Sequence, residues 1–129
     1  MKSTKFLAIV GGVSLLMAEA ASVSAAAATL RVRCEVRSDR SKISVDGKRI
    51  KSTGDVTAVV TNTHGLSVTA PGKPIVLKEV EFDFDSDSGD IAEGATAIPS
   101  DFIDRSNPHV TASIPELSLQ KTVACKVKK

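Results

Sequence analysis

The chain has 129 residues, with 17 Lys and Arg against 15 Asp and Glu, and its formal net charge is +2. Such a balance gives no global field that would draw the protein to nucleic acid or to an anionic membrane, so we expect no nucleic-acid partner. A chain of this length forms one domain with a modest core.

The first 25 residues have the pattern of a secretory signal peptide. Lys2 and Lys5 precede an apolar run at 6–17, and small residues follow at 18–28. The apolar run is about 12 residues long, whereas a bilayer-spanning helix needs about 20. A retained membrane anchor is the competing interpretation.

We place signal cleavage after Ala25, with Ala21 and Ala27 as alternatives, because small residues occupy the positions that a signal peptidase recognises. The domain division is then 1–25 for the signal peptide and 26–129 for a single folded domain. The pattern predicts an exported protein, periplasmic or extracellular, without an integral membrane segment after cleavage.

Two cysteines, Cys34 and Cys125, lie near opposite ends of the predicted mature chain. An oxidising compartment favours a disulfide between them. A redox-active pair is more often closely spaced, as in C-x-x-C, so we expect a structural bond.

Runs with a period of two recur through the mature chain, and this period is typical of β-strands. Residues 30–37 alternate apolar side chains with arginines, so the first strand is expected to be basic on its outer face. Asp46-Gly47 between 43–45 and 48–50 predicts a β-hairpin with a tight type I′ turn. A second hairpin is expected around His64.

The later segments are less regular. Residues 71–74 contain two prolines and should interrupt the sheet. Residues 91–107 lack periodicity and are expected to form a long connection, with one short helical turn near Ser100. Alternation resumes at 110–114 and again in the last run, 117–127.

About seven short strands with turns between them predict an all-β fold, a small antiparallel β-sandwich with one disulfide, resembling the immunoglobulin or transthyretin architectures. A small closed β-barrel is the alternative. The immunoglobulin pattern itself is incomplete, because the chain has no tryptophan and no tyrosine.

The densest charge lies in the acidic segment Glu79–Asp90, where acidic and apolar residues alternate. Val80, Phe82 and Phe84 are predicted to face the core, and Glu81, Asp83 and Asp85 to face solvent, because successive strand side chains point to opposite faces. The segment ends in a polar turn that contains Gly89.

Asp85, Asp87 and Asp90 are a tentative Ca²⁺ site, since oxygen ligands close to a glycine turn are typical of calcium loops. The spacing matches an EF-hand only in part. The simpler interpretation is a solvated strand face whose charges protect a sheet edge. Apart from this Ca²⁺, no cofactor is expected.

The acidic strand can also pair with the arginines of the first strand, or the two rows can contact another protein. The predicted contact surface consists of Arg31, Arg33, Arg37, Glu81 and Asp83. We therefore expect a non-catalytic binding or structural module acting through protein contacts. The alternatives are a weak Ca²⁺-binding module that uses residues 83–90, and a small hydrolase with a carboxylate pair from 79–93.

Overall fold

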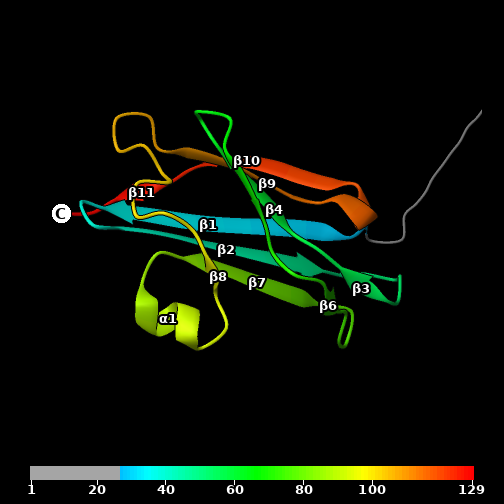
Figure 1. The fold of residues 1–129 in the computed structure, drawn as a ribbon. Helices are drawn as coiled ribbons and strands as arrows, with labels where there is room; N and C mark the ends of the chain where they lie inside the picture. Colours follow the sequence, from blue (N-terminus) through cyan, green and yellow to red (C-terminus); the bar gives the residue numbers. More distant parts are fainter. Residues whose placement is uncertain (1–26) are drawn as a thin grey trace, which may run out of the picture.

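The structure, a computed structural model, describes residues 27–129, and the predicted signal peptide with its preferred cleavage site lies outside them (Figure 1). The elements in chain order are β1 (Thr29–Arg37), β2 (Arg40–Lys48), β3 (Asp55–Val56), β4 (Val59–Asn62), β5 (Ser67–Thr69), β6 (Lys73–Pro74), β7 (Val80–Asp85), α1 (Ser88–Ala92), β8 (Thr96–Ala97), β9 (His109–Ile114), a 3₁₀ turn at Pro115–Leu117, β10 (Leu119–Ala124) and β11 (Lys126–Val127). Over this part of the chain, no helix is long and apolar enough to cross a membrane.

Two sheets pack face to face and confirm the predicted sandwich. One has the strand order β11-β1-β2-β7-β8 and the other the order β10-β9-β4-β5, while β3 and β6 form a separate small pair. The strands do not close into a barrel. The strands outnumber the seven expected because four of them are two-residue pieces, β3, β6, β8 and β11, too short to show a period of two.

The core lies between the sheets and is built from the alternating apolar positions. Ile43, Val45, Phe82 and Phe84 come from the five-stranded sheet, and Ile114 comes from the opposite sheet; all are buried. The connection 91–107 is pinned to this core by Ile98, Phe102 and Ile103, which are also buried.

The predicted hairpin at Asp46-Gly47 is wrong, because both residues lie within β2. The hairpin turn is two residues long and lies between Arg37 and Arg40, which pair across β1 and β2. A Cβ on Gly47 would lie 3.1 Å from side-chain atoms of Ile50 and Ile114. Glycine is therefore used here for close packing inside a strand, and not for a turn.

Gly47→Ala is expected to lower the free energy of unfolding by about 1 to 3 kcal/mol, because the added methyl overpacks a filled core. Chemical denaturation of the variant and the wild type measures this difference. Gly72→Ala is the control, since the nearest atom to its Cβ would be 3.6 Å away. Equal effects of the two substitutions would contradict the packing explanation.

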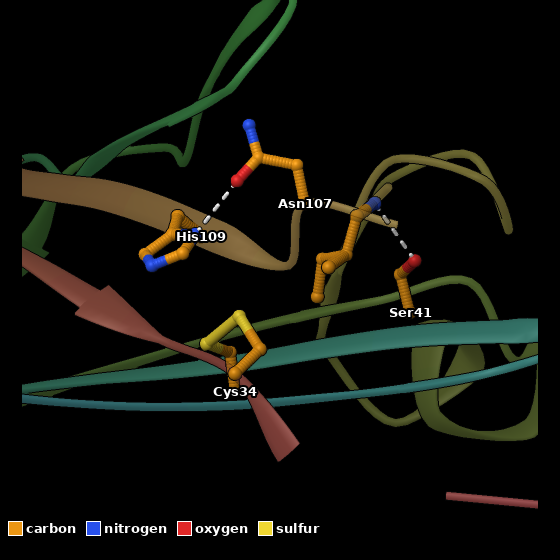
Figure 2. Close-up of a disulfide and its surroundings, with 6 residues drawn as sticks. Cys34, Ser41, Asn107 and His109 are labelled. Carbon is orange, nitrogen blue, oxygen red and sulfur yellow. Dashed lines mark hydrogen bonds between the residues drawn. A yellow bond between two sulfur atoms is a disulfide. The ribbon is translucent and has the colours of Figure 1, made fainter. Parts of the chain in front are cut away.

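The disulfide between Cys34 and Cys125 is present, as predicted, and Figure 2 shows its surroundings. The chain leaves the four-stranded sheet at the end of β10, passes through the half-cystine, and joins the five-stranded sheet as β11. There β11 runs parallel to β1, with Glu35 opposite Lys126. The disulfide thus fixes the position at which the chain passes from the four-stranded sheet to the five-stranded sheet.

The helical turn expected near Ser100 is wrong, and the helix of the described chain is α1, capped by the Asp87 side chain. Residues 99–102 form a hydrogen-bonded turn instead. This segment is held by the buried Ser41, whose hydroxyl donates to the Ser100 carbonyl at 2.8 Å. The same hydroxyl accepts from the Ile103 amide at 3.1 Å, and Figure 2 shows this second bond. Tertiary hydrogen bonds thus replace helical ones here.

Candidate functional site

The outer face of the five-stranded sheet gathers most of the predicted site residues. On β7, Val80, Phe82 and Phe84 are buried, and Glu81 and Asp83 are exposed, which confirms the predicted register. Asp85 is only 1% exposed, so its predicted exposure is wrong. It does lie on the outer side of the strand, but Arg40 and the connection to α1 cover it.

The basic and acidic rows share this face but do not pair directly. Arg31 and Arg33 lie on β1 and Glu81 lies on β7, with β2 between the two strands. Arg33 contacts Asp46 of β2 at 3.4 Å. The expectation that the arginines pair with the acidic strand is therefore wrong, because a third strand separates the rows by about 10 Å, two strand spacings.

Two other members of the rows, Arg37 and Asp83, contact residues close to them. Arg37 lies 3.5 Å from Glu35 on its own strand, and Asp83 accepts a hydrogen bond from Ser44 at 3.0 Å. Among the described residues, Arg31 and Glu81 take part in no ion pair. The charge of each row is thus only partly neutralised within the molecule.

An open hollow of about 1070 Å³ lies between the rows. Its lining is mostly charged and includes Arg33, Lys42, Glu81, Asp83 and Lys126. In the middle of the face, Asp46 has one buried carboxylate oxygen without a hydrogen-bond partner among residues 27–129.

At one end of the hollow, Arg40 binds two carboxylates. Its guanidinium donates to Asp85 through Nε at 2.9 Å and through Nη2 at 2.7 Å, a bidentate pair. Nη2 also lies 2.6 Å from an oxygen of Asp90. The sequence analysis did not single out Arg40. Had β2 been predicted to begin at Arg40, this residue would have fallen two positions before Lys42, among the outward-facing side chains of the strand.

The pKa values of the two carboxyls shift in opposite directions. Burial raises the pKa of Asp85, but the hydrogen bonds from Arg40 and from the Asp87 amide outweigh it, and the pKa falls to about 2. The nearby Asp85 carboxyl raises the pKa of Asp90. Asp85 is therefore ionised at neutral pH and belongs to a structural ion pair.

Asp85→Asn is expected to lower the free energy of unfolding by about 2 kcal/mol at pH 7, because it removes the charge that Arg40 binds. A lowered folded-state pKa stabilises the protein above the ordinary value of 3.8, and this contribution is lost as the pH falls toward about 2. The difference between wild type and variant should therefore shrink over that range.

Urea denaturation of both proteins at a series of pH values measures this difference. Asp83→Asn is the matched control, since Asp83 lies on the same strand face but is exposed. A difference for Asp85→Asn that is the same at pH 7 and near pH 2 would contradict the ion-pair explanation.

The tentative calcium ligands are close together, but they are engaged by groups of the protein. Asp85 and Asp90 share the Arg40 guanidinium, and Asp87 accepts from the Asp90 amide at 3.2 Å as the helix cap. Over residues 27–129, no group of three or more acidic, histidine or cysteine side chains has metal-binding geometry. Calcium binding stays a prediction, and a bound cation would have to displace Arg40.

The protein was compared with models of known families, with curated proteins and with solved structures, and none of the three comparisons found a match.

Proposed function

We propose that the protein is an exported, non-catalytic binding module that contacts a protein partner through the outer face of its five-stranded sheet. The observation that supports this proposal most directly is the separation of charge on that face. A row of exposed arginines on β1 and a row of exposed acids on β7 flank one open hollow, and each row is only partly neutralised.

The partner is expected to carry a complementary pair of rows about 10 Å apart, as set by the strand spacing. A second copy of the chain meets this requirement. Turned by 180° about an axis along β2, it would place Arg31 and Arg33 over Glu81 and Asp83 of the first copy. Association should weaken as salt is added, because the charges are exposed.

The charges at the end of the hollow favour binding over catalysis. A carboxylate pair that hydrolyses a glycoside needs one member that stays protonated at the working pH. The pKa of Asp85 is about 2 and the pKa of Asp90 is raised, but the Arg40 guanidinium holds both carboxyls, so neither is free to act on a substrate. The hydrolase alternative therefore has no support from this pair.

A photo-crosslinking residue in place of Glu81, introduced into the exported protein in its own cells, tests the proposal. We expect a defined crosslinked product, whose mass distinguishes a second copy from another protein. The same residue in place of Thr122, which is exposed on β10 of the other sheet, is the control. Charge reversal by Arg31→Glu with Arg33→Glu should abolish the product.

Crosslinking that is equal at the two positions, or that survives the charge reversal, would refute the proposed use of this face.

A further inference from the structure

The turn between β6 and β7 carries exposed apolar side chains at its tip. Leu77 is 92% exposed and Val76 is 60% exposed. The turn is well held, because Val76 and Glu79 exchange two backbone hydrogen bonds, of 2.9 and 3.0 Å, and the Ile50 amide donates to the Lys78 carbonyl at 3.0 Å. The apolar tip is therefore a fixed protrusion.

The residues at the tip are poorly suited to the turn that they form. Leu77 and Lys78 both have positive φ values, 53° and 66°. A two-residue turn with this geometry strongly favours Asn-Gly, since side chains with a Cβ are strained there. A strained, exposed leucine contributes nothing visible to the fold, and strained positions of this kind are often functional.

Three cations are close to the turn: Lys78 belongs to it, and Arg49 and Lys51 flank Ile50, whose amide donates to the Lys78 carbonyl. Arg49, Lys51 and Lys78 are exposed and have no ion-pair partner among the described residues, whereas Lys48 is paired with Glu79 at 3.4 Å. Two other acids lie at this end: Glu116, which accepts hydrogen bonds from Thr57, and the exposed Asp55. The apolar tip is thus set among free positive charges, despite the near-neutral chain.

The described chain begins at the same end of the molecule. Ala27 and Ala28 line a shallow pocket together with Arg49 and Lys51. In Figure 1, β6 and β3 lie at this end, and α1 lies at the opposite end of the sandwich. The first described residues of the predicted mature chain therefore lie beside Arg49 and Lys51.

We propose that the turn Val76–Glu79, together with Arg49 and Lys51, docks the protein on an anionic membrane surface. A convex apolar protrusion flanked by cations fits a deformable interface, in which the leucine enters the boundary between headgroups and acyl chains while the cations bind lipid phosphates. A rigid flat protein surface could not cover such a protrusion. This inference is independent of the charged sheet face.

Cosedimentation of the purified exported protein with vesicles tests the proposal. We expect binding to phosphatidylcholine vesicles that contain phosphatidylglycerol, weaker binding as salt is added, and little binding to phosphatidylcholine alone. Leu77→Asn should lower the partition coefficient about tenfold, from loss of part of a leucine's transfer free energy. Lys51→Gln should lower it about fivefold.

The variants separate binding from folding. Asparagine tolerates positive φ better than leucine, so Leu77→Asn should leave the melting temperature unchanged or raise it. Leu66→Asn and Lys121→Gln are matched controls, since both residues are exposed but lie outside the basic tip, and neither should change vesicle binding.

Failure of the wild type to bind the anionic vesicles would overturn the proposal and leave a pocket of a partner protein as the site for this tip. Binding that Leu77→Asn leaves unchanged would also overturn it.

Discussion

Replacing both cysteines, Cys34→Ala with Cys125→Ala, is expected to lower the free energy of unfolding by about 4 to 5 kcal/mol. The bond closes a loop with a sequence separation of 91 residues, and in the chain-entropy model such a loop strongly restricts the unfolded chain. Small domains are stable by only about 5 to 15 kcal/mol. The variant should therefore be close to unfolding at growth temperature.

Urea denaturation of the double variant and of the oxidised wild type measures the loss. Reduction of the wild type should reproduce it, and the same reductant should leave the double variant unchanged. Coincident denaturation midpoints for the oxidised wild type and the double variant would contradict a stabilising role for the bond.

Phe82→Ala is expected to lower the free energy of unfolding by about 3 to 5 kcal/mol. The Phe82 side chain is 2% exposed and lies opposite Val45 of β2, inside the main core. Truncation would leave a cavity between the two sheets that rigid neighbours fill only in part.

Glu81→Ala, one residue earlier on the same strand, is the matched control and should change the free energy by less than about 0.5 kcal/mol. Denaturation of the two variants under the same conditions measures both values. If the strand were displaced by one residue, the two effects would exchange, since a shift of one position turns every side chain to the other face.

The local alternation of the chain predicted much of the sheet correctly. Val80, Phe82 and Phe84 are buried because a period of two separates the faces of a strand whatever its neighbours are. The disulfide was predicted from the expected export and from a single pair of cysteines. The strand faces depend on residues near one another in sequence. The disulfide depends on two cysteines that have no other cysteine to pair with.

Tertiary structure alone decided the features that depend on distant residues. Asp46-Gly47 continues a strand because Ile50 and Ile114 pack against the glycine, so its local preference for a turn is overridden. The separation of the charged rows depends on strand order, which places β2 between β1 and β7.

The exposure of Asp85 also depended on distant residues. The alternation along β7 predicted the correct face for its side chain but the wrong exposure. Its burial depends on Arg40, 45 residues earlier, whose guanidinium binds the carboxylate. Leu77 is exposed because the hydrogen bonds between Val76 and Glu79 close a tight turn around it, although its apolar side chain favours burial. Local pattern thus determined which side of a strand a residue faces, whereas long-range packing determined what covers it.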